Sequence, residues 1–129
     1  MKHAEIAYFK TPMVPPSPFD FSGHWQNELG SYMELQISAN VIIGTYVSAV
    51  SDTGGPTLPF PVQGSVAGDL ISLSVNWGGA ISSWTGHGVL TGTKQRILTL
   101  WHLIQTVKDE TDPAQQWKML LAGADEFTR

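Results

Sequence analysis

The histidine, serine and acidic side chains are the groups in this chain that could bind metal or perform catalysis. The chain has four histidines, and no two of them stand at zinc-ligand spacing with a carboxylate nearby. Ser65 lies in G-S-V-A-G, which lacks the G-x-S-x-G order of a nucleophile elbow. The acidic run at 109–112 is typical of a solvated loop. Cysteine is absent, so thiol chemistry is excluded as well. We therefore predict no metal, no cofactor and no activated nucleophile.

The composition predicts one folded domain with no nucleic-acid or membrane partner. At 129 residues the chain is long enough for one core and too short for two ordinary domains. Its net charge of −4 gives no attraction to nucleic-acid phosphates or anionic lipids. No apolar run approaches the ~20 residues of a membrane helix. Residues 1–6 also lack the apolar core of a signal peptide, so we expect an intracellular protein or one whose signal has been removed.

Residues 1–21 differ in character from the rest of the chain. They contain clustered prolines and no sustained period, so we interpret 1–21 as an irregular N-terminal extension and 22–129 as the domain. Beyond Phe21, β-branched and aromatic runs alternate with Gly, Asn, Asp and Pro, which is typical of an all-β protein. The predicted strands are 23–28, 32–38, 41–50, 60–67, 70–77, 81–90, 95–106 and 116–127. Such short strands fit either a sandwich or a closed up-and-down barrel, and composition does not choose between them.

The strand predicted around Trp101 is apolar on both faces. Successive side chains of a strand point to opposite faces. The two sets are Ile97, Thr99, Trp101 and Leu103 on one face and Leu98, Leu100, His102 and Ile104 on the other. One of these faces has no core to enter, and a large exposed apolar patch usually marks an interface. This pattern predicts a homo-oligomer.

Three segments carry motifs that resemble a known family. Residues 25–31 read W-Q-N-E-L-G-S, residues 44–50 read G-T-Y-V-S-A-V, and residues 121–128 read L-A-G-A-D-E-F-T. They are similar to the first-strand, third-strand and closing motifs of the avidin and streptavidin family, and the resemblance extends over residues 23–128. It implies an eight-stranded antiparallel up-and-down β-barrel that holds one biotin in its open end.

Strand parity gives an independent check on these motifs, since pocket residues on one strand must lie two apart. Asn27 lies two residues from Trp25, and Ser48 lies two residues from Tyr46. The check is passed. Trp25 falls at the closed base of the family's barrel, so we assign it to core packing.

The resemblance also implies a role for each site residue. Asn27, Ser31 and Tyr46 would donate hydrogen bonds to the ureido oxygen of biotin, because fixed donors stabilise partial negative charge. Ser48 and Asp125 would accept the two ureido N–H groups, and the carboxylate would make the stronger bond. The complete set of expected biotin contacts is Asn27, Leu29, Ser31, Tyr46, Ser48, Val50, Asp52, Trp77, Ser82, Trp84, Trp101, Leu103, Trp117 and Asp125.

Residues 80–86 depart from the family motif S-A-T-T-W-S-G and read A-I-S-S-W-T-G. Ser82 can replace the threonine beside the biotin sulfur, but Ala80 has no hydroxyl for the biotin carboxylate. The segment 78–83 is also shorter than its counterpart in the family. Asp52, in the expected lid 51–59, would place a negative charge close to that carboxylate. We therefore expect the contacts to the biotin tail to be altered.

The resemblance implies biotin and biotinylated molecules as partners, and a secreted or periplasmic location. It favours a tetramer over a dimer, because Trp117 would close the biotin site of a neighbouring subunit. The alternative is a dimer in which Trp117 covers its own barrel rim.

Two rival functions remain, a lipocalin-like carrier of another apolar ligand and a small barrel hydrolase. The carrier would need an apolar pocket without convergent polar groups, whereas Asn27, Ser31 and Asp125 make this site polar at its base. Tight, non-catalytic binding of biotin is therefore the predicted function.

Overall fold

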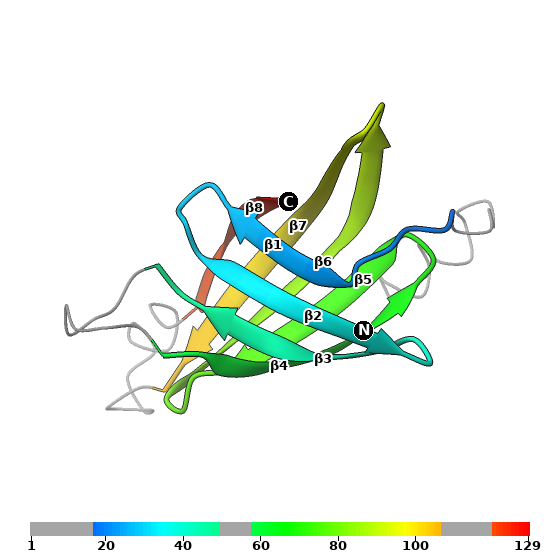
Figure 1. The fold of residues 1–129 in the computed structure, drawn as a ribbon. Coiled ribbons are helices and arrows are strands. Elements are labelled where there is room, and N and C mark those ends of the chain that lie inside the picture. Colours follow the sequence, from blue (N-terminus) through cyan, green and yellow to red (C-terminus); the bar gives the residue numbers. More distant parts are fainter. Residues whose placement is uncertain (1–16, 50–57, 107–119) are drawn as a thin grey trace, which may run out of the picture.

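The computed structural model describes residues 17–49, 58–106 and 120–129. Within these residues, eight strands join in chain order into one closed antiparallel barrel (Figure 1). The strands are β1 (Gly23–Asn27), β2 (Tyr32–Ser38), β3 (Val41–Val47), β4 (Phe60–Ala67), β5 (Leu70–Asn76), β6 (Ala80–Thr91), β7 (Lys94–Gln105) and β8 (Leu120–Thr128). The predicted up-and-down barrel is confirmed, and the sandwich is excluded. The described part of the chain has no helix long and apolar enough to span a membrane.

The predicted boundaries agree to within one residue for β1, β2 and β4 to β7 and for the end of β8, whose predicted start at 116 lies outside the described residues; β3 ends earlier than predicted. We expected this strand to continue to Val50, but it ends at Val47. Its ladder with β2 stops at the same residue. The backbone N–H of Ala49 donates instead to the Oγ of Ser31, 2.9 Å away, so the chain leaves the sheet for lack of a strand partner. Val50 itself lies outside the described residues.

Alternation divides each strand between the barrel interior and the solvent. On β5, Ile71, Leu73 and Val75 are buried, and Ser72 between them is exposed. On β7, Thr99 is buried and the adjacent Leu100 is 72% exposed. The buried hydrophobic core consists of Phe21, Trp25, Met33, Leu35, Ile42, Tyr46, Val62, Ile71, Leu73, Val75, Trp84, Ile97 and Phe127.

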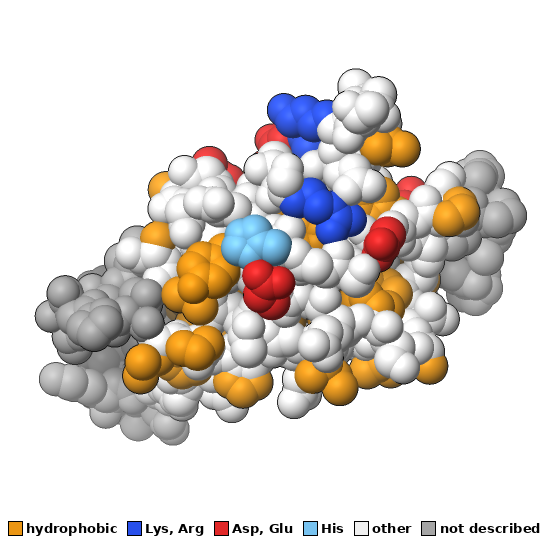
Figure 2. Space-filling view, viewed as in Figure 1, with side chains coloured by type: hydrophobic (Ala, Val, Ile, Leu, Met, Phe, Trp, Pro, Cys, Tyr) orange, Lys and Arg blue, Asp and Glu red, His pale blue; other side chains and the backbone are white. Residues whose placement is uncertain are grey.

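The outer surface bears few cations. On the face shown in Figure 2, lysine and arginine side chains are scattered among acidic and neutral groups. Two ion pairs occur among the described residues, His24 with Glu34 and Arg96 with Glu126. The face therefore has no broad basic area that would attract a nucleic acid.

One end of the barrel is closed by the segment before β1 and by the last residue of the chain. Trp25 is completely buried there, and its Nε1 donates to the carbonyl of Phe21 at 2.9 Å. Phe19 packs over Gly88, where an added Cβ would lie 2.5 Å from the ring, so only glycine leaves room for it. The Arg129 guanidinium lies 4.1 Å from the centre of the Trp25 ring. Trp25 is thus a core residue, as expected.

The opposite end of the barrel contains the β1–β2 turn and the other residues predicted to bind a ligand. In an up-and-down barrel the β1–β2 and β5–β6 connections lie at the same end, away from Arg129 (Figure 1). The β5–β6 connection is tight, because the backbone N–H of Trp77 donates to the carbonyl of Ala80 at 2.8 Å. Of the segment 78–83, only Gly78 and Gly79 lie outside a strand, because β6 begins at Ala80, one residue before the predicted start at 81.

We expect Arg129→Ala to lower the free energy of unfolding by about 1 kcal/mol, because the cation–π contact and the hydrogen bonds to the carbonyls of Asp20 and Ser22 are lost. Urea denaturation measures this change. The matched control is Arg96→Ala, which removes a partly exposed ion pair with Glu126 and should cost less. Equal urea midpoints for Arg129→Ala and the wild type would show that the arginine does not stabilise this end of the barrel.

Candidate ligand-binding site

The β1–β2 turn is organised by the side chain of Asn27, the last residue of β1. Its Oδ1 accepts the backbone N–H groups of Leu29 at 3.1 Å and Ser31 at 2.9 Å. Because these two donors occupy the oxygen, the amide NH2 points away from the turn as a donor. Asn27 is 8% exposed, so this donor is directed into the barrel beside Asp125.

Ser31 and Tyr46 place two hydroxyl groups at the same end. Both residues are buried, and the Oγ of Ser31 already accepts the N–H of Ala49. Burial raises the pKa of the Tyr46 hydroxyl to about 12, and a hydrogen bond with Ser31 opposes this effect. Tyr46 therefore keeps its proton at neutral pH and remains a donor.

Asp125 on β8 is the acidic group of this cluster. It is half-buried, and its Oδ2 accepts a hydrogen bond from the Trp84 Nε1 at 3.1 Å. Its backbone carbonyl accepts from the Thr99 hydroxyl at 3.0 Å, which fixes β8 against β7. Burial raises the pKa of the Asp125 carboxyl, the Trp84 bond lowers it, and the negative charge of Glu28 raises it further.

Aromatic rings line the barrel next to these polar groups. Tyr46 stacks on Trp84 with a centroid distance of 5.0 Å and an interplanar angle of 28°. Trp77 meets Tyr46 edge-on at 5.8 Å and Phe60 at 4.9 Å. Its Nε1 donates to the Oγ of Ser82 at 2.9 Å, which orients the indole. Rings fixed in this way offer apolar contact area at little entropic cost.

Trp101 lies flat against β8 because its partner across the ladder is Gly123. A Cβ at Gly123 would lie 2.6 Å from the Trp101 Cζ2. The glycine of the closing motif therefore makes room for the indole. Leu103, two residues further along the same face, is half-buried and pairs with Ser82.

The structure brings together Asn27, Ser31, Tyr46, Trp84 and Asp125 through the contacts described above. Ser48 follows β3 and is half-buried, while Leu29 is 68% exposed on the β1–β2 turn. Three further predicted residues, Val50, Asp52 and Trp117, lie outside the described residues.

Sequence reasoning missed Glu28, Thr99 and Phe60, each of which touches a predicted site residue. Thr99 could have been predicted, because it lies two residues from Trp101 and therefore on the same face of the strand. Phe60 begins the strand after the expected lid, but nothing in its spacing connects it with Trp77. Glu28 alternates with Asn27, so strand parity alone would direct its side chain away from the barrel interior.

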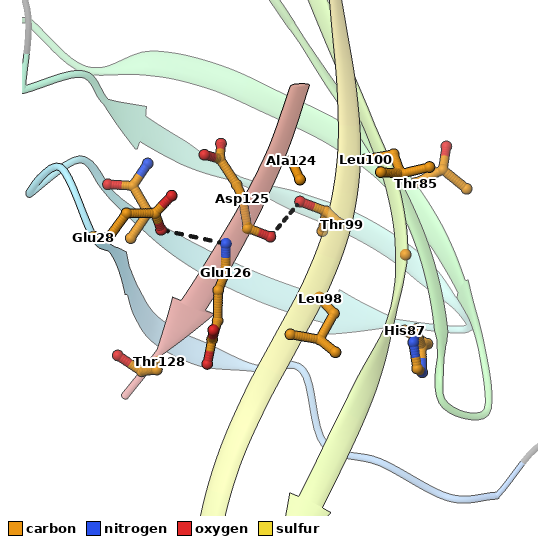
Figure 3. Close-up of a pocket in the computed structure, with 12 residues that line it drawn as sticks. Glu28, Thr85, His87, Leu98, Thr99, Leu100, Ala124, Asp125, Glu126 and Thr128 are labelled. Atoms are coloured by element: carbon orange, nitrogen blue, oxygen red, sulfur yellow. Dashed lines mark hydrogen bonds between the residues drawn. The ribbon is translucent and has the colours of Figure 1, made fainter. Parts of the chain in front are cut away.

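A groove of about 820 Å³ runs along the outside of β6, β7 and β8 (Figure 3). Most of its lining comes from outward positions such as Thr85, His87, Leu98 and Leu100. It reaches the polar cluster only at Asn27 and Asp125. The groove is therefore a feature of the barrel wall, distinct from the aromatic-lined interior. Within the described residues, no group of three or more His, Asp or Glu side chains could hold a metal ion.

A closed barrel with hydrogen-bonding groups and aromatic rings converging at one inner end defines a small-molecule-binding β-barrel. The sequence profile of the Avidin family matches residues 15–129, and the chain belongs to this family. Avidin-family proteins are non-catalytic, which confirms the prediction that the chain is not an enzyme.

Individual relatives agree with this assignment. Afifavidin from Afifella pfennigii is 34% identical over 114 residues, which cover 83% of this chain and 67% of the relative. Among solved structures, xenavidin gives a TM-score of 0.76 at 28% identity, covering 88% of this chain and 99% of xenavidin. A rhizavidin–biotin complex gives a TM-score of 0.70 at 28% identity, covering 85% of this chain and 95% of rhizavidin.

We expect Gly123→Ala to displace the Trp101 indole, because the new methyl group would overlap its ring. Near-UV circular dichroism should change, while the far-UV spectrum keeps its β-sheet form. Gly92→Ala is the control for steric overlap, because no atom lies within 4 Å of the Cβ position at Gly92. The positive φ of Gly92 adds backbone strain to this variant but no overlap with a ring. An unchanged near-UV spectrum for Gly123→Ala would show that Trp101 does not rest on this glycine.

Proposed function

We propose that this protein binds biotin tightly and without turnover in the open end of the barrel. The observation that carries the proposal is the convergence of three donors, from Asn27, Ser31 and Tyr46, beside the carboxylate of Asp125. A ureido group needs this pattern, because one oxygen accepts several bonds and two N–H groups donate. The similarity to a rhizavidin–biotin complex supports the same ligand.

In this proposal the ureido oxygen receives the three donors, and Ser48 and Asp125 accept the two N–H groups. The ionised carboxylate makes the stronger, charge-assisted hydrogen bond. Trp77, Trp84 and Trp101 enclose the ring system, with Ser82 and Leu103 beside it. Biotin has about 16 non-hydrogen atoms, and a limit of ~1.5 kcal/mol per atom permits very tight binding.

The remaining contacts follow from the sequence. Leu29, Val50, Asp52 and Trp117 complete the proposed set of biotin-contacting residues. Ala80 offers no hydroxyl to the biotin carboxylate, so we expect the tail to be held less specifically than the ureido ring. We also propose that residues 22–129 are the binding domain and 1–21 an extension, of which Phe19 and Phe21 pack into the closed end of the barrel.

We further propose a homo-tetramer, with the outer face of β7 as one interface. Leu100 is 72% exposed and Ile104 is 51% exposed on this face, next to Ile81 of β6, which is 49% exposed. A second copy of the same face could cover these side chains about a two-fold axis. Trp117 would then contribute to the site of a neighbouring subunit.

Biotin titration of the wild type by isothermal calorimetry tests the ligand, and Asp125→Ala tests the site. We expect this variant to bind biotin more weakly by about 2 kcal/mol or more, because it removes a half-buried charge-assisted acceptor. Glu126→Ala, on the outward side of the same strand, is the matched control and should keep the wild-type affinity. An unchanged affinity for Asp125→Ala, or hydrolysis of biotin esters, would contradict the proposal.

Light scattering on the wild type, on Leu100→Lys and on Trp117→Ala tests the assembly. We expect a wild-type tetramer, a smaller species for Leu100→Lys because a charge enters the apolar face, and weaker biotin binding for Trp117→Ala. Leu90→Lys adds the same charge at another exposed leucine and should leave the mass unchanged. A wild-type dimer, or a Trp117→Ala tetramer with full biotin affinity, would exclude the shared site.

A further inference from the structure

The joint between the first and last strands is the most weakly paired in the barrel. β1 and β8 share two paired positions, Gln26 with Thr128 and Asn27 with Phe127, whereas β7 and β8 share nine. Because β1 ends at Asn27, the part of β8 that contains Asp125 has no β1 backbone beside it. The edge of β8 is therefore open next to the acidic group of the site.

Glu28 occupies this gap. Its Oε2 accepts the backbone N–H of Glu126 at 3.3 Å, in place of the carbonyl that a longer β1 would offer. Figure 3 shows the Glu28 side chain beside β8, next to Asp125, and the negative charge of Glu28 raises the pKa of the Asp125 carboxyl. A second acid thus lies against the acceptor of the proposed site.

We infer that Glu28 is a positioning residue of the biotin site, which closes the β1–β8 joint beside Asp125 and makes biotin binding more sensitive to acid. This inference rests on the proposed function. It adds a residue outside the expected set of contacts, and it assigns to that residue control over the acid sensitivity of binding.

The groups around Asp125 leave Glu28 as the dominant charge. From β3 the Tyr46 hydroxyl faces it, and from β6 the Trp84 indole, both uncharged at neutral pH. On β7, the Arg96 Nη1 lies 3.2 Å from the Glu126 Oε1 and is paired with that carboxylate on the outer face. Within the described residues Glu28 forms no ion pair.

The direction of the pH effect follows from the protonation of Asp125. The ionised carboxylate accepts a ligand N–H more strongly than the protonated acid does, so a proton on Asp125 weakens biotin binding. Burial raises the pKa of Asp125 in the free protein, and the Glu28 charge adds to this. Affinity is therefore constant above that pKa and falls below it, by at most about tenfold per pH unit for a single carboxyl group. Removing the Glu28 charge should lower the pKa of Asp125 and preserve binding to lower pH.

The test uses Glu28→Gln, which removes the charge but keeps an oxygen that can accept the Glu126 N–H. Glu34→Gln is the matched control, because it makes the same change in charge on the outer face of β2, at the pair with His24. Competition between biotin and a fluorescent biotin conjugate is measured over about pH 3 to 8, the range of carboxyl titration. Far-UV circular dichroism defines the range in which each protein stays folded.

We expect Glu28→Gln to bind several-fold more tightly than the wild type at acidic pH, with similar affinity at pH ~8. Carbon-detected NMR of the ligand-free proteins should show Asp125 titrating at lower pH in Glu28→Gln and unchanged in Glu34→Gln. Coincident Asp125 titrations in the wild type and Glu28→Gln would overturn the inference. A wild type that binds no biotin at neutral pH would instead overturn the proposed function, while the NMR titration still decides the coupling.

Discussion

The polar end of the barrel depends on the side chain of Asn27. One oxygen satisfies two backbone N–H groups of the β1–β2 turn, and this bonding fixes the direction of the amide donor. The same turn carries Ser31, whose Oγ holds Ala49 where β3 leaves the sheet. It also carries Glu28, which reaches across to β8. The turn, the end of β3 and the β1–β8 joint are therefore organised around one amide.

The two ends of the barrel differ in what their buried indole groups contact. At the closed end, Trp25 is covered by Phe21 and Arg129, and all of its contacts serve stability. At the other end, an indole of the same chemistry, Trp84, donates its N–H to Asp125. Burying a carboxyl group there is unfavourable, which is why its pKa rises. A ligand that donates to this carboxylate would offset that cost.

The strands could be predicted because alternation and turn residues depend on local chemistry, whereas the closed barrel was implied only by the family motifs. Asn27, Tyr46 and Asp125 could be proposed as site residues because each stands within a motif that resembles a family motif. Glu28 could not, because its position depends on where β1 ends relative to β8, and this is a property of strand register. The end of β3 at Val47 was missed for the same reason, since the next residues remain compatible with a strand.

The hydrogen bonds within the free site show how a ligand can gain affinity without disrupting the protein. The bonds that hold the turn use the Oδ1 of Asn27 and the Oγ of Ser31 as acceptors. Donation to a ligand would use the NH2 and O–H hydrogens of the same groups, so the structural bonds can remain in place. Two sets of bonds in the free site would compete with a ligand: those that Asn27 and Trp84 direct at the Asp125 carboxylate, and the bond between the Ser31 and Tyr46 hydroxyl groups. A carboxylate has about four lone-pair sites, which leaves room for a ligand N–H beside them.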